Sequence, residues 1–314
     1  DSDDLPLNVS REMLQKEANV ARLRKQIVKR VLDHLQKLAD SDEEADRAIY
    51  AGIDREFGQV LREGMVNDFE NRDKVAKLAR WQSTWTLDQE VGEEEQPVTT
   101  GLEAYKARMP AGQEQIYYIT APSLASARSA PQLEGYRKKG YEVLFFTAPV
   151  DEFIGQHYTR FEDTELVNVL SGDSQLEDEE SKEALARRSE EFKPFLDWSK
   201  EELDGIKEVR LTSRLTDSPC CIVNDRQGMT TQMEELMKSF GQSVPEQERI
   251  LELNPDHELV QRLQALHGDE GRRDTVRDHL QVLRDQALLA EGAKIKDQGS
   301  FAQRVQRLMA QALG

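Results

Sequence analysis

The chain has almost no cysteine: Cys220 and Cys221 are the only two among its 314 residues, and they are adjacent. Neighbouring residues rarely satisfy the geometry of a disulfide, so the sequence favours a reducing compartment and a cytoplasmic location. The five histidines lie at no metal-ligand spacing from one another or from cysteine. We therefore expect no metal site.

Long apolar runs and glycine-rich loops are also missing. No apolar stretch approaches the roughly 18 residues of a membrane span, and no signal-peptide pattern opens the chain, so we expect no membrane partner. The phosphate-binding patterns GxGxxG and GxxxxGK followed by Ser or Thr do not occur. The GxSxG nucleophile elbow is absent as well. The sequence therefore offers no glycine-rich nucleotide loop and no serine hydrolase motif.

Positive charge is scarce. The 60 Asp and Glu residues outnumber the 42 Lys and Arg residues, which gives a net charge of −18. A phosphate backbone requires a basic surface, so we expect no nucleic-acid partner. With 38% hydrophobic and 32% charged residues, the chain is typical of a charged, helix-rich protein, and its length suits roughly two domains.

The first part of the chain has the period of packed helices. We expect helices over residues 10–38, 43–61 and 72–81. Their apolar residues recur every three or four positions, and we assign them to the core: Val20, Leu23, Ile27, Val31, Leu35, Leu38, Ile49, Ile53, Phe57, Val60, Val75, Leu78 and Ala79.

Residues 100–172 have the pattern of a small α/β unit, which follows an acidic, irregular stretch. We expect strands over residues 115–120 and 141–146, because both are rich in apolar and aromatic residues. Between them lies a helix over residues 131–139 that ends at Gly140. Such a strand, helix and strand should form a parallel, right-handed unit.

An acidic run with little apolar content, residues 173–191, is expected to be partly a solvated helix and partly the domain boundary. Beyond it we expect strands over residues 209–211, 221–223 and 250–253, and helices over residues 192–203, 229–240, 274–291 and 300–313. Asn254 is expected to cap a further helix that has Pro255 at its first position.

The predicted fold class is α+β or α/β, helix-rich, with small α/β units in two domains. The first domain covers residues 1–185, with its helical segment at 10–85 and its α/β unit at 100–172. The second covers residues 192–314 and ends in a pair of amphipathic helices.

The stretch Leu5–Gln15 is predicted to be a loop that becomes a helix. Ser10 can cap that helix with its hydroxyl group. Arg11 then lies beside a helix N-terminus, where anions bind, and its guanidinium can hold a phosphate in a fork. A surface ion pair with Asp3 or Asp4 is the more common arrangement for such an arginine.

This stretch, LPLNVSREMLQ, resembles the catalytic loop in the middle domain of the 90-kDa heat-shock chaperone family, in its bacterial branch. Further segments resemble that family in the same order: residues 71–84, RMP at 108–110, QIYYIT at 115–120, RLTDSP at 214–219, ELNPDH at 252–257 and DQALLA at 285–290. The resemblance covers nearly the whole chain. It implies that the family's N-terminal nucleotide-binding domain and the start of its middle domain are absent from this chain.

The resemblance also implies a role for this loop. In the full-length family protein, which uses ATP and Mg, Arg11 would contact the γ-phosphate of ATP bound to the N-terminal domain. Gln15 would lie one turn further along, and Asn8 would shape the loop. This chain alone is expected to hold no cofactor and not to be an enzyme.

Met229, Met233, Leu236 and Met237 fall on one face of an expected helix. An ordinary core stripe explains this spacing, whereas three methionines in nine residues suit a surface that accepts many partners. The resemblance favours the second alternative, a surface that contacts unfolded or partly folded client proteins. Phe153 matches a family position that faces the cleft in which client proteins are bound.

The last two helices carry apolar side chains that either the preceding domain or a second copy must bury. The resemblance favours a homodimer held by a four-helix bundle. The residues expected in this interface are Leu280, Leu283, Leu288, Phe301, Val305, Leu308 and Met309.

The expected function is that of a chaperone fragment that binds clients, dimerises and supplies the catalytic-loop arginine. If the resemblance to the chaperone family is set aside, the alternative is a non-catalytic α/β dimeric scaffold whose acidic surface docks a basic partner. A third hypothesis is a hydrolase that uses paired carboxylates such as Asp151, Glu152 or Glu165. Among 60 acidic residues, however, such pairs arise by coincidence.

Overall fold

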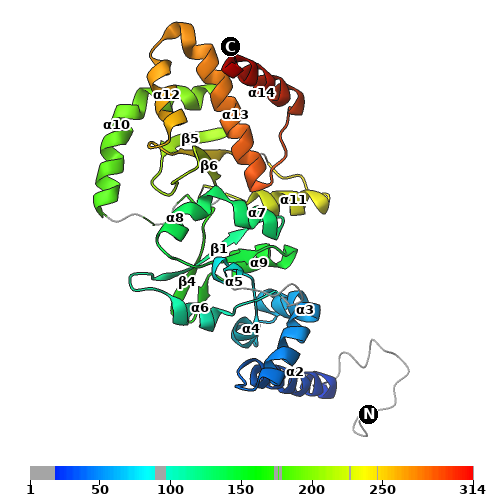
Figure 1. Ribbon diagram of the computed structural model, residues 1–314. Coiled ribbons are helices and arrows are strands. Elements are labelled where there is room, and N and C mark those ends of the chain that lie inside the picture. The colour runs from blue at the N-terminus through cyan, green and yellow to red at the C-terminus, as the bar shows by residue number, and fades with distance from the viewer. Residues whose placement is uncertain are drawn as a thin grey trace. The chain divides into compact units, whose positions relative to one another are not determined.

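The computed structural model describes residues 18–88, 97–172, 176, 179–225, 228–245 and 247–313. The chain divides into two compact units. The first extends to Arg80 and includes Gly101–Glu103, and the second comprises Trp81–Thr100 and the chain from Ala104 onward. Helices dominate, and two small sheets, each with parallel and antiparallel pairs, carry the described strands (Figure 1). The predicted fold class is confirmed, whereas a domain division between residues 185 and 192 stays a prediction.

The first unit is built from three helices that pack on one another: α2 (Ala18–Ala39), α3 (Glu44–Asn67) and α4 (Arg72–Leu78). Its core contains Leu38 of α2, Tyr50 and Met65 of α3, and Val75 of α4. The Tyr50 hydroxyl donates a hydrogen bond to the backbone carbonyl of Leu78. The helix predicted over residues 72–81 ends at Leu78, three residues before its predicted end.

The assignment of the apolar stripes of α2 and α3 to the core holds for Leu38 but was wrong for half of the residues. Five of those residues are more than half exposed: Ile27, Val31, Ile49, Phe57 and Val60. Instead, α3 buries a face that contains Gly58 and Arg62. The Arg62 guanidinium donates to the Arg80 carbonyl at 2.8 Å. Hydropathy does not mark such a face, because a glycine and a hydrogen-bonded arginine carry no apolar signal.

The second unit opens with a four-stranded sheet in the order β2-β1-β4-β3. The strands are β1 (Gln115–Thr120), β2 (Val143–Phe146), β3 (Arg160–Phe161) and β4 (Thr164–Asn168). The helices around it are α5 (Thr84–Leu87), α6 (Leu102–Arg108), α7 (Leu124–Ser129), a 3-10 turn (Pro131–Leu133), α8 (Glu134–Lys138) and α9 (Pro149–His157). Strand β1 is parallel to both β2 and β4, as predicted for β1 and β2. The sequence analysis missed β3, β4 and α9.

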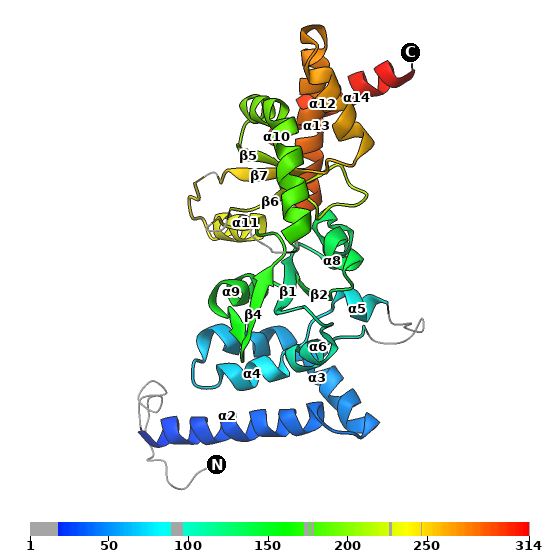
Figure 2. The same cartoon turned by 90° about the vertical axis from the view of Figure 1, so that its left-hand side faces the viewer.

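Alternate residues of β1 face opposite sides of this sheet, in accordance with the two-residue period of a strand. Tyr117 and Ile119 join the core formed with α7 and α8. Tyr118 lies on the other side, where its hydroxyl donates to the Gly155 carbonyl of α9 at 3.2 Å. Figure 2 shows α8 and α9 on opposite sides of β1.

The second sheet has the order β5-β7-β6, with β7 parallel to β5 and antiparallel to β6. The strands are β5 (Ile206–Leu211), β6 (Cys220–Val223) and β7 (Arg249–Leu253). The helices are α10 (Glu179–Glu202), α11 (Thr231–Ser239), α12 (Glu258–His267), a 3-10 turn (Glu270–Arg272), α13 (Arg273–Glu291) and α14 (Gln298–Leu313). Helix α10 contacts β5 and α13 contacts β6, and these elements enclose one apolar core.

Two boundaries differ from the prediction. Helix α10 begins at Glu179, so the helix expected in part of the acidic run is present, but it continues without a break into the helix predicted to start at residue 192. Asn254 is not the cap of α12. Its side-chain oxygen accepts from the Asp256 amide at 3.0 Å and so closes a turn, and the His257 ring nitrogen caps the helix by accepting from the Leu259 amide at 3.1 Å.

Buried polar contacts connect the two sheets within the second unit. Arg214 pairs with Glu252 at 2.8 Å, with both side chains almost fully buried, and donates to the Val169 carbonyl at 2.9 Å. Gln132 donates to the Ile222 carbonyl at 2.7 Å. Because a buried charge whose partner is removed is costly, these contacts constrain how the two sheets pack.

Candidate functional site

The predicted phosphate-contacting residues Asn8, Arg11 and Gln15 lie outside the described residues. Their geometry therefore does not enter the description of the site. Among the described residues, no group of three or more His, Cys, Asp or Glu side chains is arranged to hold a metal ion. No helix in the described part of the chain has the length and apolarity of a membrane span.

Helix α9 carries Phe153, and it is anchored by Asp151 and Glu152, the two acidic residues directly before Phe153. Pro149 occupies the first turn, where a missing backbone N–H has no cost. The Asp151 carboxylate accepts from the Ala148 amide at 2.9 Å and from the Trp81 indole N–H at 3.1 Å. Both anchoring residues are buried, and Phe153 is half-buried. The sequence therefore positions Phe153 on a helix whose start is fixed.

Helix α11 is tied to α9 through its N-terminal cap. The Thr230 hydroxyl accepts from the Met233 amide at 3.1 Å and donates to a Glu152 carboxylate oxygen at 2.7 Å. Burial raises the pKa of Glu152 above its ordinary value, although the hydrogen bond from Thr230 opposes that shift. One threonine thus starts α11 and holds it beside the helix that carries Phe153.

The apolar face of α11 is only partly accessible. Met229, Leu236 and Met237 are half-buried. Met233 is only 3% exposed, so it packs inside the protein and does not present the surface expected of it. Phe240, which follows the helix, is 66% exposed. The structure therefore places α11 in contact with α9, the helix that carries Phe153, but it assigns Met233 to the interior.

A buried ionic cluster that the sequence analysis missed lies at the base of α11. Arg249, the first residue of β7, pairs with Glu234 of α11 at 2.5 Å. It also donates to the Asn224 side chain at 2.9 Å and to the Met229 carbonyl at 2.8 Å. The carboxylate of Glu291 is fully buried nearby, and burial raises its pKa to about 7 despite the opposing charge of Arg249.

Two charged positions in the sequence belong to this cluster, but only their combination could have pointed to it. Glu291 directly follows the apolar run Ala287–Ala290, and Arg249 directly precedes the buried strand residues Ile250–Leu253. A charge at the end of an apolar element is usually solvated, so neither position is informative alone.

The residues predicted for a dimer interface fall into two groups. Leu280 and Leu283 are buried in the core of their own unit, and Leu288 packs against that core. They do not present a free surface, because β6 and its neighbours already cover α13 there. Phe301, Val305 and Leu308 of α14 are half-buried, and Met309 is 62% exposed.

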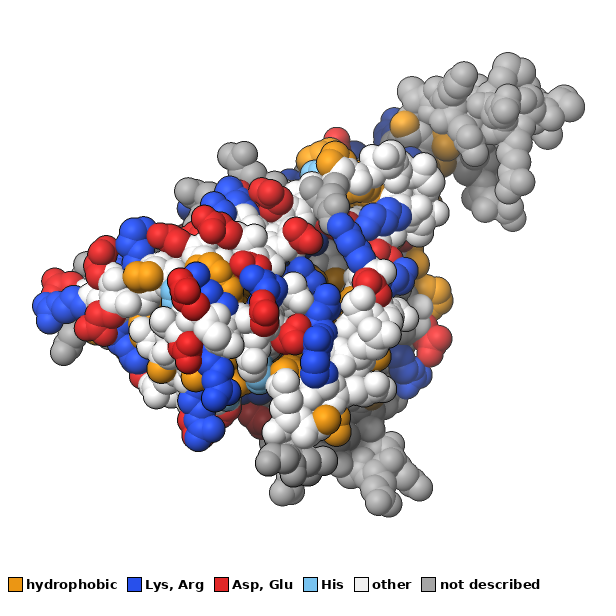
Figure 3. All heavy atoms as spheres, turned by 90° about the horizontal axis from the view of Figure 1, so that it is seen from above, with side chains coloured by type: hydrophobic (Ala, Val, Ile, Leu, Met, Phe, Trp, Pro, Cys, Tyr) orange, Lys and Arg blue, Asp and Glu red, His pale blue; other side chains and the backbone are white. Residues whose placement is uncertain are grey.

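The carboxylates proposed for a hydrolase have other roles. Asp151 and Glu152 each bind helix caps, and Glu165 accepts from the exposed Gln115 amide at 3.2 Å. The face of the molecule in Figure 3 shows acidic and basic side chains intermixed, with hydrophobic side chains in small groups. That face therefore offers no continuous acidic surface for a basic partner.

Comparison with known proteins shows a family-level match. The whole chain, residues 1–314, matches the family model described as Hsp90 protein. It is 47% identical over 312 residues to Chaperone protein HtpG of Paraburkholderia xenovorans, covering 98% of this chain and 47% of that protein. Chaperone protein HtpG of Geobacter metallireducens is 44% identical over 314 residues, covering 98% of this chain and 46% of the relative. The chain thus spans about half the length of the curated relatives it matches.

Proposed function

Because the chain belongs to the Hsp90 family, we propose that it is the middle and C-terminal part of an ATP-driven, dimeric chaperone. In this proposal, α9 and α11 present the surface that contacts unfolded or partly folded client proteins. The final helix pair joins two copies, and Arg11 acts on ATP that is bound by a domain outside this chain. The chain by itself would then hold no nucleotide and would not be an enzyme.

The observation that carries the client-binding proposal is the hydrogen bond from Thr230 to Glu152. It brings together two helices that are distant in the sequence, so that Phe153 and Met237 belong to one region of the fold. Unbranched, polarizable methionine side chains adapt to many apolar shapes. The exposed ring of Phe240 extends the apolar area at the end of the same helix.

The structure makes a sharp distinction between two methionines of this face. Met237→Glu should weaken suppression of the aggregation of a heat-unfolded test protein and leave the far-UV circular dichroism spectrum unchanged, because Met237 is half-buried. Met233→Glu should instead destabilise the fold, because it places a charge in the interior. Leu266→Glu on α12 introduces the same charge at an exposed apolar position outside this region. If Leu266→Glu reduces chaperone activity as much as Met237→Glu, the proposed surface is wrong.

The role proposed for Arg11 needs a second component. The separately purified N-terminal domain of a relative, mixed with this chain, should show faster ATP hydrolysis than that domain alone. Arg11→Lys keeps the charge but loses the planar fork that binds phosphate, and Arg11→Ala removes both. A rate increase that persists in Arg11→Ala would remove this arginine from the mechanism.

Dimerisation can be tested on the chain as it stands. A dimer would have twice the mass of the 35.9 kDa chain in sedimentation equilibrium. Met309→Lys should weaken association without unfolding, because this side chain is exposed on α14. If the protein sediments as a monomer at all accessible concentrations, or if Met309→Lys leaves the dimer intact, the proposed interface is incorrect.

A further inference from the structure

The second unit contains a cavity on the side of the four-stranded sheet opposite to α9. Its volume is about 450 Å³, and it lies among α5, α6, α7 and the end of α8. Figure 2 shows α5 and α8 on one side of β1 and α9 on the other. Nothing in the proposed client-contact surface of α9 and α11 involves this cavity.

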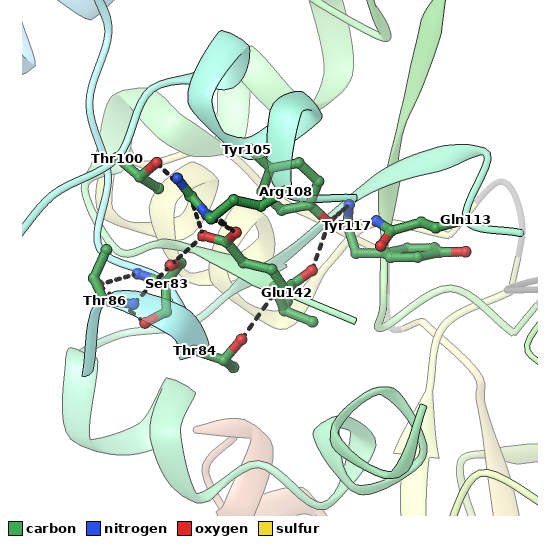
Figure 4. A network of polar contacts seen from close by, with 10 residues as sticks. Ser83, Thr84, Thr86, Thr100, Tyr105, Arg108, Gln113, Tyr117 and Glu142 are labelled. Atoms are coloured by element: carbon green, nitrogen blue, oxygen red, sulfur yellow. Dashed lines mark hydrogen bonds and ion pairs between the residues drawn. The ribbon is translucent and has the colours of Figure 1, made fainter. Parts of the chain in front are cut away.

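One wall of the cavity is organised by a partly buried ion pair between Arg108 and Glu142. The Arg108 guanidinium donates to both carboxylate oxygens of Glu142 at 2.9 to 3.0 Å and to the Thr100 hydroxyl at 2.7 Å. The Ser83 hydroxyl donates to the same carboxylate at 2.5 Å. Figure 4 shows these side chains converging on Glu142. The charge of Arg108 is thus already neutralised within the protein.

The other two basic residues of the cavity make no ion pair with a described residue, although Asp88 also lines the cavity. Arg128 of α7 and Arg137 of α8 both line it and are exposed. The Arg137 guanidinium donates to the Arg128 backbone carbonyl at 2.7 Å, which holds the two residues together. Within the described part of the chain, neither guanidinium pairs with a carboxylate. Two adjacent arginines without acidic partners are unexpected in a chain with a net charge of −18.

Aromatic rings lie beside these arginines. Trp85 is 38% exposed and lines the cavity, with the Arg108 guanidinium 3.9 Å from its ring centroid. Tyr141 lines the cavity as well and stacks on Tyr117, with 5.7 Å between the ring centroids. Such rings provide flat apolar area whose position is already fixed.

The Gln113 side chain, which lines the cavity, is held in one orientation by the protein. The Gln113 side-chain N–H groups donate to the Tyr105 hydroxyl at 2.9 Å and to the Gln115 carbonyl at 2.7 Å. Because a carbonyl can only accept, these bonds fix the orientation of the amide. Its oxygen then accepts no hydrogen bond from any residue that the structure describes. Because that oxygen is buried, Gln113 contributes a fixed wall of the cavity and not a contact for a ligand.

We propose that this cavity binds a short acidic segment of a partner protein, with carboxylates on Arg128 and Arg137 and an aromatic side chain against Trp85 and Tyr141. Arginine matches carboxylates with two parallel hydrogen bonds, and the aromatic walls match an apolar side chain. A nucleic acid fits less well. Its many phosphates would be repelled by the surrounding negative charge, whereas a peptide needs to place only two carboxylates.

The test uses the complete 314-residue chain and the fluorescein-labelled hexapeptide Asp-Glu-Phe-Asp-Glu-Phe, followed by fluorescence anisotropy. The double variant Arg128→Gln with Arg137→Gln should bind this peptide about tenfold more weakly, because it loses both charge-assisted contacts. The control is Lys138→Gln, which removes one positive charge next to Arg137 but outside the cavity lining, and its charge-matched comparison is Arg137→Gln alone. Lys138→Gln should change the affinity less than about twofold. The unlabelled peptide should also alter tryptophan emission in the wild type but not in Trp85→Phe.

Three results would overturn the proposal. One is failure of the peptide to bind. Another is equal affinity for the peptide in which lysine replaces every acidic residue, which would show that charge recognition is absent. A third is equal loss in Lys138→Gln and Arg137→Gln, which would show that only the net charge of the surface matters. Met237→Glu separates this site from the client-contact surface, because peptide affinity should be unchanged in that variant.

Discussion

Glu291 provides a direct test of the cluster beneath α11. It is the last residue of α13 and is followed by Gly292, whose φ of 91° ends the helix in the left-handed region. Only 7% of its surface is exposed, and neither carboxylate oxygen accepts a hydrogen bond from a described residue. Thr231 and Asn224 are neighbours that do not reach hydrogen-bonding geometry. An ionised carboxylate in this position is therefore poorly solvated.

The stability cost of ionising Glu291 follows from the pKa of its carboxyl group. Burial raises the pKa of Glu291 from 4.5 to about 7, and the negative charge of Glu234 acts in the same direction, while Arg249 opposes both. Each pH unit between the folded and unfolded pKa is worth about 1.4 kcal/mol. Ionisation of Glu291 in the folded protein therefore costs about 3 kcal/mol of stability.

The direction of the pH dependence is determined by which state binds the proton. Below pH 4.5 the carboxyl group is protonated in both states, so it imposes no penalty. Between pH 4.5 and about 7 the folded state retains a proton that the unfolded state has lost, and stability falls as the pH rises. Above about pH 7 both states are ionised and the penalty is complete.

Glu291→Gln removes this ionisation with little change in side-chain volume. The stability advantage of the variant over the wild type should grow by up to about 3 kcal/mol from acid to neutral pH and then stay constant. Urea unfolding followed by circular dichroism, at a series of pH values, measures this difference. Glu291→Met, which also has no charge, should show the same trend. Parallel pH profiles for Glu291→Gln and the wild type would refute the argument.

Three further predictions concern burial. Phe57→Ser should change the free energy of unfolding by less than about 0.5 kcal/mol, because this ring is 63% exposed. Met65→Ala on the same helix should instead cost about 2–5 kcal/mol. A large loss of stability in Phe57→Ser would show that something covers that face. Arg214→Leu should cost about 1–3 kcal/mol in urea unfolding, because it removes the more deeply buried of the two arginines that pair with Glu252 and leaves only Arg210, at 2.7 Å, and an unchanged midpoint would contradict this. Burial raises the pKa of the Cys220 thiol to about 12, so it should react with a thiol reagent only after denaturation, and rapid labelling of the folded protein would contradict its burial.

The elements that could be predicted from the sequence are those in which local pattern and burial agree. The strand Gln115–Thr120 is apolar or aromatic at its four central positions because it lies between two parallel neighbours, and its predicted bounds match the structure. Helix α9 and strand β4 were missed because their residues alternate between buried and exposed over short lengths. The cap of α12 was placed too early because Asn254 and Pro255 suit both a helix start and a turn.

The first unit shows where periodicity fails. The spacing of Ile49, Phe57 and Val60 correctly identified a helix but not the face that the helix buries. Arg62 lies on the buried face, where its hydrogen bond to a backbone carbonyl makes burial acceptable. A hydrogen bond between residues 18 positions apart depends on tertiary structure, and no local pattern contains that information.

Helix α11 shows why the candidate site was predicted only in part. The same apolar stripe changes its environment along the helix, from Met233, which is 3% exposed, through half-buried Leu236 and Met237, to Phe240, which is 66% exposed. The buried end is the one that Thr230 fixes beside α9, so the gradient follows from the anchor at the N-terminal cap. A helical stripe that is anchored at one end can therefore serve as core at that end and as an accessible apolar surface at the other. The choice between core and surface, which the spacing of the methionines left open, is thus answered residue by residue and not for the helix as a whole.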